Sequence, residues 1–380
     1  MTHVFDLTRP KLKASLEELG FKGFRADQVW QWVYQKGSND PAHMTNLGAA
    51  DKAKLKEGLS FALPEITAEQ KAADGVIKWL LKMPDGHEVE TVFIPQGKRG
   101  TLCVSSQVGC TLTCRFCHTG TQALARNLTT GEIIAQVWLA KRQLQDFTDA
   151  DTARKLTNIV FMGMGEPLYN KDNVFDACRI LMDDKGFGMG GRKITISTSG
   201  VAPEIGDIGE DLGVNLAISL HSADDDTRTK IMPLNKKYPL SVLQEALKGF
   251  RLRENRRITW EYVMLKGIND SLEDAEKLLQ FIKPFPSLVN LIPFNPWPGS
   301  PFECSTQKTM QAFYNRIAKA GVDVTLRQTR GEDILAACGQ LRSESSGRNT
   351  VSLQYPTVVA VYGNERQKTL KVAIAHGEDD

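Results

Sequence analysis

Three cysteines in one short segment are the strongest chemical signal in this sequence. Cys110, Cys114 and Cys117 stand four and three residues apart in the stretch GCTLTCRFCH. The stretch follows the first strand predicted for the main domain, at the strand end where α/β folds place their active sites. Three thiolates on one loop can bind three irons of a [4Fe–4S] cluster and leave the fourth iron open to a substrate. The spacing therefore predicts an iron–sulfur site.

A structural zinc site is the alternative interpretation of these cysteines, with His118 as the fourth ligand. Structural zinc sites usually combine two ligands from one segment with two from another, and the sequence offers no second pair. His118 also follows Cys117 directly, which places it poorly for reaching the same metal ion. We therefore favour the cluster and keep zinc as the alternative.

Polar or small residues also follow four of the later predicted strands. They are Gly165 and Glu166 after the second strand, Ser197 at the third, Ser219, Leu220 and His221 at the fourth, and Asn295 at the sixth. Because the carboxyl ends of parallel strands meet at one edge, these residues should surround one mouth of the domain. Turn formation is the alternative for any single Ser or Asn. Their shared position predicts a ligand site beside the cysteine loop.

The chain from Thr101 onward predicts the elements that position these residues. Strands are expected at TLCVSS, NIVFMG, KITIST, NLAISL, ITWEYVML and LVNLIPF, with a further β-like run at VDVTLR. Helices are expected to begin near Thr130, Asn173, Pro203, Ser241, Ser271 and Gln307. Strands and helices that alternate in this way indicate an α/β fold with a parallel sheet covered by helices. A barrel, a part-barrel and an open sheet all fit the pattern.

The segments outside this core have different patterns. Residues 9 to about 66 carry helical spacing and predict a small helical unit. GVIKWLLKM, a PDG turn and HEVETVFIP predict a β-hairpin. We therefore divide the chain into an N-terminal helical domain (1–75), a β-hairpin linker (76–98), a core (99–342) and a tail (343–380). We expect the tail to be partly mobile.

The overall composition limits the class of protein. The 47 basic and 45 acidic residues give a net charge of +2, which neither indicates nor excludes a local basic face for nucleic acid. No apolar run is long enough to span a membrane, and the N-terminus lacks the apolar region of a secretory signal, so we expect a cytoplasmic protein. The 7 cysteines should then be reduced, and a cluster of them indicates metal binding or catalysis.

The motifs resemble a known superfamily. CxxxCxΦC after a first strand is typical of radical-SAM enzymes, which act on S-adenosylmethionine (SAM). Gly163-Met-Gly-Glu-Pro167 resembles the GGEP element that holds the amino group of SAM. There Glu166 would accept hydrogen bonds from an ammonium group, and Gly165 would let the backbone approach the ligand.

A closer resemblance covers roughly residues 80–342. VETVFIP, CVSSQVGCTLTCRFCHTG, MGMGEPLYN, ISTSGVAP, LAISLHS, IMPLNKKY, LIPFNP and RGEDILAACGQL are similar to the RlmN/Cfr family of RNA methyltransferases, and most similar to its RlmN-type members. The resemblance implies a radical-SAM partial (β/α)6 barrel with an N-terminal helical accessory domain. It also implies methylation of C2 of an adenosine in the peptidyl-transferase centre of 23S rRNA and of the adenosine beside the anticodon in tRNA. Methylation of C8, as by Cfr-type members, is the nearest alternative, and a zinc-containing RNA-binding protein is a more distant one.

The resemblance further implies which residues act. The cluster would be held by Cys110, Cys114 and Cys117, and SAM by Gly165, Glu166, Ser197, Ser219, Leu220, His221 and Asn295. Two SAM molecules would be consumed per turnover. The first would methylate the Cys338 thiolate. The second would yield a radical that activates this methyl group for addition to the adenine.

Two more residues would complete the reaction. Cys103 would attack the sulfur of Cys338, release the product and leave a Cys103–Cys338 disulfide. Glu90 matches the proton acceptor of the family. Without the resemblance, each of these cysteines would be interpreted as a small buried residue and Glu90 as a solvated one. A flavodoxin or ferredoxin-type electron donor and a thiol reductant are implied as partners.

Basic residues at two places could neutralise RNA phosphates. Arg251, Arg253, Arg256 and Arg257 form one group, and Arg115, Arg126, Lys141 and Arg142 flank the cysteine segment and the helix after it. Solvated helix faces are the alternative for each of them. The target adenine would have to leave its stack and enter the barrel mouth.

Overall fold

A computed structural model describes residues 1–147 and 154–342 of the 380-residue chain. Its main feature is an open sheet with the strand order β14-β13-β12-β11-β10-β9-β6-β5-β4-β3. The strands are β3 (Glu65–Lys71), β4 (Ile77–Lys82), β5 (Glu88–Gln96), β6 (Arg99–Cys103), β9 (Asn158–Phe161), β10 (Ile194–Thr198), β11 (Asn215–Ser219), β12 (Ile258–Met264), β13 (Ser287–Pro293) and β14 (Asp323–Leu326). The predicted tail 343–380 lies outside the described residues.

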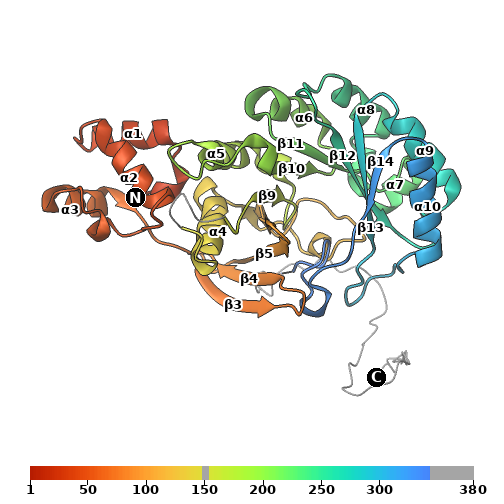
Figure 1. The fold of residues 1–380 in the computed structure, drawn as a ribbon, viewed down its shortest axis with the longest axis horizontal. Coiled ribbons are helices and arrows are strands. Elements are labelled where there is room, and N and C mark those ends of the chain that lie inside the picture. The colour runs from red at the N-terminus through yellow and green to blue at the C-terminus, as the bar shows by residue number, and fades with distance from the viewer. Residues whose placement is uncertain (148–153, 343–380) are drawn as a thin grey trace, which may run out of the picture.

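The half of the sheet from β6 to β14 is parallel and curves as a part-barrel. Helices cover its outer side (Figure 1). They are α4 (Thr130–Gln143), α5 (Lys171–Met182), α6 (Ile205–Asp207), α7 (Asp225–Ile231), α8 (Leu240–Lys248), α9 (Leu272–Ile282) and α10 (Gln307–Lys319). The predicted alternation of strands and helices is confirmed, and it leaves the carboxyl ends of the strands at one edge. The helix predicted near Pro203 is shorter than a usual one, because α6 passes into a π-helical turn at Ile208–Leu212.

The other half of the sheet is antiparallel. The predicted hairpin forms β4 and β5, and β5 also pairs with β6, so the hairpin extends the main sheet. The strand β3 pairs with β4 and forms the outer edge. The sequence analysis missed β3, because its side chains are almost all exposed and its sequence, EITAEQK, lacks an apolar run. This strand falls within the range assigned to the N-terminal helical domain.

The N-terminal unit consists of α1 (Arg9–Glu18), α2 (Phe24–Tyr34) and α3 (Ala49–Gly58), and β1 (Thr2–His3) pairs with β2 (Leu59–Ser60). It packs against α4 and α5 (Figure 1). The indole nitrogen of Trp138 on α4 donates to the backbone oxygen of Val33 on α2 at 2.9 Å. Arg9 forms an ion pair of 2.8 Å with Asp183 just after α5. The helical unit is therefore docked on the core.

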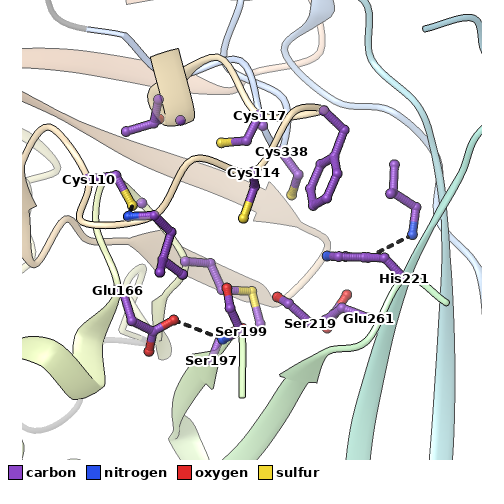
Figure 2. A pocket seen from close by; sticks show the side chains of 18 of the residues that line it. Cys110, Cys114, Cys117, Glu166, Ser197, Ser199, Ser219, His221, Glu261 and Cys338 are labelled. Atoms are coloured by element: carbon purple, nitrogen blue, oxygen red, sulfur yellow. Dashed lines mark hydrogen bonds between the residues drawn. The ribbon is translucent and has the colours of Figure 1, made fainter. Parts of the chain in front are cut away.

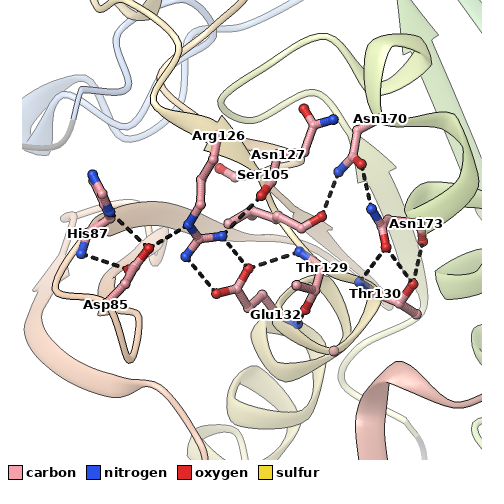
Figure 3. A network of polar contacts seen from close by, with 12 residues as sticks. Asp85, His87, Ser105, Arg126, Asn127, Thr129, Thr130, Glu132, Asn170 and Asn173 are labelled. Carbon is pink, nitrogen blue, oxygen red and sulfur yellow. Dashed lines mark hydrogen bonds and ion pairs between the residues drawn. The ribbon is translucent and has the colours of Figure 1, made fainter. Parts of the chain in front are cut away.

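The cysteine segment forms a loop between two short strands, β7 (Gln107–Val108) and β8 (Arg126–Asn127), which pair with each other. Arg126 at the base of this loop forms two hydrogen bonds with Glu132, of 2.7 and 2.8 Å, and a 2.5 Å ion pair with Asp85 in the β4–β5 turn (Figure 3). Glu132 also completes a capping box with Thr129 at the start of α4. These contacts fix the base of the loop to the hairpin and to the first core helix.

Candidate active site

One pocket opens at the carboxyl ends of the parallel strands, as the sequence predicted. Cys110, Cys114 and Cys117 form part of its wall, and the ends of β9 to β13, Arg327 after β14 and the segment at Cys338 form other parts. The predicted residues that line it are Cys110, Cys114, Cys117, Gly165, Glu166, Ser197, Ser219, His221 and Cys338. Figure 2 shows the cysteines of the loop on one side and the strand-end side chains facing them. The pocket therefore combines sulfur ligands with polar groups that could hold a second molecule.

The three thiols of the loop share a buried environment. Burial raises the pKa of Cys110 to about 12 and also raises the pKa values of Cys114 and Cys117. The thiols are therefore protonated in the absence of a metal, and a bound cationic cluster would displace their protons. Soft sulfur donors that face one space are the donor set that iron–sulfur clusters require.

His118, the fourth ligand of the alternative zinc site, is already engaged in other contacts. Its ring stacks on Trp297 with 4.8 Å between centroids and 7° between planes. Its ring nitrogens face the backbone oxygen of Gln340 at 3.4 Å and the guanidinium of Arg342 at 3.1 Å. These contacts favour the cluster over mononuclear zinc.

Glu166 is held by the ends of two strands. It is 2% exposed, and its carboxylate accepts backbone hydrogen bonds from Ser199 at 2.8 Å and from Leu168 at 3.1 Å. Burial raises the pKa of Glu166, and these hydrogen bonds act in the opposite direction. The side chains of Thr198 and Ser199 also form hydrogen bonds with this carboxylate, so Glu166 is a buried and firmly held acceptor at the pocket wall.

Gly165 makes this geometry possible. Its φ of +100° lies in the region that favours glycine, and a Cβ here would stand 2.5 Å from the Cβ of Gln107. The amide of Glu166 accordingly donates to the side-chain oxygen of Gln107 at 3.0 Å. The loop after β9 therefore runs close against the start of the cysteine loop.

His221 provides a neutral donor. Its φ is +58°, and its Nδ1 accepts a hydrogen bond from the amide of Val263 at 3.0 Å. Burial lowers the pKa of His221 to about 3, and the charge of Arg228 acts in the same direction. Because Nδ1 accepts, Nε2 carries the proton, and Figure 2 shows the ring reaching into the pocket.

Four predicted residues do not line the pocket. Leu220 is fully buried, and its amide and carbonyl bond to Glu261 and Arg228. Asn295 donates to the backbone oxygen of Cys338 at 3.2 Å. Glu90 and Cys103 lie on β5 and β6 and are not among the lining residues, although Cys103 is near enough to Cys338 for the two thiols to interact electrostatically.

The sequence analysis missed two charged residues of the pocket. Glu261 on β12 is 4% exposed, and its Oε2 has no hydrogen-bond partner among the described residues. Arg327 follows β14, and its Nη1 lies 3.8 Å from the sulfur of Cys338. A single charged residue in an apolar strand, as in ITWEYVML, is the signal that could have identified Glu261.

The predicted basic groups are mostly engaged or distant. Arg251 to Arg257 precede β12, so they lie at the amino ends of the parallel strands, opposite the pocket. Within this group, Arg257 pairs with Asp323. Near the loop, Lys141 pairs with Asp146 at 2.9 Å, whereas Arg115 is exposed. Basic residues close to the pocket are therefore better candidates for RNA contact than the group before β12.

Comparisons with known proteins agree with this geometry. Residues 104–282 match the radical SAM superfamily, and residues 2–60 match the ribosomal RNA large subunit methyltransferase N-terminal domain. A radical SAM methyltransferase from Sphaerobacter thermophilus has a similar crystal structure, with a TM-score of 0.83 and 39% identity over 90% of this chain and 99% of that one. No helix among the described residues has the length and apolar character needed to cross a membrane.

Two curated relatives are similar over most of their length. The dual-specificity RNA methyltransferase RlmN of Rhodospirillum rubrum is 54% identical over 89% of this chain and 80% of its own. The protein of the same name from Rhodopseudomonas palustris is 52% identical over 89% and 88%. The cofactors of a radical SAM protein are a [4Fe–4S] cluster and SAM, and the pocket has the sulfur and polar groups to hold both. This chain belongs to the RlmN family of radical SAM methyltransferases.

Proposed function

We propose that this chain methylates C2 of an adenosine in the peptidyl-transferase centre of 23S rRNA and of the adenosine beside the anticodon in tRNA. The observation that carries the proposal is the shared pocket of the three loop cysteines, Glu166 and Cys338. The name of its relatives, dual-specificity RNA methyltransferase, supports RNA as the substrate.

In this proposal Cys110, Cys114 and Cys117 hold the cluster, which supplies the electron that cleaves SAM when both are bound. SAM is held by Gly165, Glu166, Ser197, Ser219, Leu220, His221 and Asn295. Glu166 would bind the ammonium group of SAM, since it is a buried carboxylate that lines the pocket. His221 would donate from Nε2 to an oxygen or nitrogen of SAM. Leu220 and Asn295 would act indirectly. The backbone oxygen of Leu220, just after β11, accepts from Arg228, and the side chain of Asn295 donates to the backbone oxygen of Cys338.

Two thiols divide the methyl transfer in this proposal. Cys338 is exposed to the pocket and would accept the methyl group from a first SAM. The guanidinium of Arg327 lies 3.8 Å from this sulfur and would help to position it for the transfer. Cys103 is buried on β6 and would attack the Cys338 sulfur. The bond from this sulfur to the methylene carbon on the adenine would break, its electron pair would go to that carbon, which takes up a proton to become the methyl group, and a disulfide would remain. The unpaired electron of the radical adduct would return to the electron-transfer system that supplied it.

Glu90 would accept the proton that leaves C2 of the adenine. Its carboxylate forms a 2.8 Å ion pair with Lys78 and accepts a 2.7 Å hydrogen bond from the amide of Arg342. Burial raises the pKa of Glu90, and Lys78 acts against this change. A carboxyl group with a raised pKa is a suitable proton acceptor near neutral pH.

The proposal also requires partners that supply electrons and reducing equivalents. A flavodoxin or ferredoxin-type donor would reduce the cluster, and a thiol reductant would reopen the Cys103–Cys338 disulfide after each turnover. Both requirements, and the absence of a membrane-spanning helix among the described residues, fit a cytoplasmic enzyme.

The test is in vitro methylation of 23S rRNA fragments and tRNA with anaerobically reconstituted protein, SAM and a reductant, followed by mass spectrometry of the nucleosides. We expect 2-methyladenosine in both RNAs. 8-Methyladenosine would contradict the C2 assignment and favour the Cfr-type reaction. A protein that contains iron and cleaves SAM but modifies neither RNA would contradict the proposed substrates.

A further inference from the structure

Arg228 on α7 is a fully buried arginine whose hydrogen bonds all go to uncharged acceptors. Its Nε donates to the backbone oxygen of Leu220 at 3.1 Å, and its Nη1 donates to the side-chain oxygen of Asn235 at 2.6 Å. Its Nη2 donates to the backbone oxygens of Ser199 at 2.7 Å and Ser219 at 3.4 Å. The guanidinium therefore binds the ends of β10 and β11 from behind the pocket.

No carboxylate contacts this guanidinium directly; Asp225, whose carboxylate accepts from the side chain of Asn235, acts on it only through electrostatic attraction. Among the described residues, no Asp or Glu oxygen lies within 4.0 Å of it, whereas Arg126 pairs with two carboxylates. Burial lowers the pKa of Arg228 to about 10, so the side chain is still charged at neutral pH. A buried charge without a counter-ion is strongly unfavourable. An arginine in such a place indicates that an anion belongs nearby.

The cysteine loop packs against the end of α7 and can carry such an anion. The amide of Arg115, next to Cys114, donates to the backbone oxygen of Ile231 at 2.9 Å, and Ile231 stands three residues after Arg228 on α7. Cys114 and Arg228 are both buried where the loop meets this helix. α7 therefore places the guanidinium beside the loop without exposing it to the pocket.

We propose that Arg228 is a positioning residue that provides the buried countercharge of the iron–sulfur cluster and raises its reduction potential. This inference rests on the proposed cluster site at the three cysteines. A [4Fe–4S] cluster with thiolate ligands carries a net negative charge, which increases on reduction. A nearby cation stabilises the reduced form more than the oxidised form, because the attraction grows with the charge. In addition, the hydrogen bonds of Arg228 hold Ser199 and Ser219 at the pocket.

The test compares Arg228→Gln, which removes the charge, with Arg228→Lys, which keeps it and loses the planar fork. Arg179→Gln is the matched control, because Arg179 is an exposed arginine on α5 that pairs with Asp176. The midpoint potential is measured by redox titration followed by electron paramagnetic resonance, without RNA, together with iron and sulfide content. We expect a lower potential in Arg228→Gln and parent-like potentials in Arg228→Lys at pH 6 and in Arg179→Gln.

These outcomes distinguish an electrostatic role of Arg228 from a role in hydrogen bonding alone. If Arg228→Gln binds a full cluster with the parent potential, the countercharge role is wrong. If Lys and Gln lower the potential equally at pH 6, Arg228 acts only as a hydrogen-bonding brace, and the proposal is also overturned.

If Arg228→Gln does not fold or does not bind iron, the pH dependence of the midpoint potential in Arg228→Lys tests the proposal. A buried lysine loses its proton more readily than arginine, so its potential should fall as pH rises while that of the parent does not. A parallel pH dependence in both proteins would overturn the proposal. A parent protein that binds no cluster would overturn both this inference and the cluster site. Normal potentials without RNA methylation would overturn only the proposed function.

Discussion

The two thiols assigned to methyl transfer lie in different surroundings. Cys338 is exposed at the pocket, whereas Cys103 is buried and burial raises its pKa to about 12. Cys338→Ala should acquire no methyl group and form no RNA adduct. Cys103→Ala should become methylated on Cys338, add to the adenine and then stall as a covalent protein–RNA species. Denaturing gels and mass spectrometry of the tryptic peptides measure both results.

Cys178 provides the control for this pair, because it is buried in α5 away from the pocket. Cys178→Ala should turn over without an adduct and lose only packing. An adduct with Cys338→Ala, or normal turnover by Cys103→Ala, would contradict the division of labour.

Glu166 gives a prediction for SAM affinity. Replacing it with Gln keeps the size of the side chain and removes the charge that would bind the ammonium group. We expect SAM binding to weaken by about 1.5–3 kcal/mol, the scale of a hydrogen bond to a charged group. Isothermal titration calorimetry on the protein with its cluster measures this change. Glu245→Gln on the exposed face of α8 should bind SAM as the parent does, and an unchanged affinity of Glu166→Gln would remove Glu166 from the site.

The sequence identified the residues whose spacing is itself unusual. Three closely spaced cysteines and a Gly-Glu pair after a strand are rare enough to predict a site. Glu261, Arg228 and Arg327 were missed, because one charged residue in a helix or strand is usually solvated. Only the tertiary structure shows that these charges lie in or behind the pocket, since the pocket is assembled from segments that are distant in sequence.

At the scale of elements, local patterns predicted the parallel half of the sheet well. Its strands are apolar runs separated by helices, so each element carries its own signal. The antiparallel half depends on pairings that no local pattern specifies. The hairpin β4–β5 was predicted, but its pairing with β6 and the exposed edge strand β3 were not. Exposed edge strands carry little apolar signal because only one side is paired and little is buried.

The conformation of the loop after β9 depends on Gly165, and this dependence can be tested by substitution. Gly165→Ala should displace the loop, because the residue has a φ of +100° and a new Cβ would contact Gln107 at 2.5 Å. We expect weaker SAM binding and a loss of stability of about 1–3 kcal/mol with the cluster retained. Gly190→Ala is the control, because Gly190 has a φ of −67° and no atom near its missing Cβ. Iron content measures retention of the cluster, calorimetry measures SAM affinity, and urea denaturation measures the free energy of unfolding. Parent-like SAM affinity in Gly165→Ala would show that the loop tolerates a side chain.

At the scale of the molecule, the N-terminal unit and the core pack against each other through buried aromatic side chains. Phe5 has ring contacts with Tyr34 of α2 and with Trp138 of α4, and all three are at most 1% exposed. The sequence predicted helices on the N-terminal side but could not predict where they dock, because apolar faces do not identify their partners. The expected boundary of the helical unit at residue 75 stays a prediction, although β3 already belongs to the main sheet.

His221, whose buried ring joins β11 and β12, makes a defined contribution to the pH dependence of stability. The pKa of His221 is about 3 in the folded protein, below its ordinary value near 6.5. Below pH 6.5 the unfolded chain therefore binds a proton that the folded protein does not bind. The free energy of unfolding should be unaffected by His221 above pH 6.5 and fall as the pH drops toward 3.

A substitution isolates this contribution. His221→Asn retains an acceptor for the amide of Val263 and tolerates the positive φ of this position. Between pH 7.5 and pH 5.5 the parent should lose about 1.4 kcal/mol more stability than His221→Asn, because the unfolded histidine gains a proton in this range. His43→Asn, at an exposed histidine of the N-terminal unit, should keep the pH dependence of the parent. Urea denaturation at both pH values measures the difference. Equal pH dependence in the parent and in His221→Asn would contradict a neutral buried His221, and with it the assignment of Nε2 as the donor that faces the pocket.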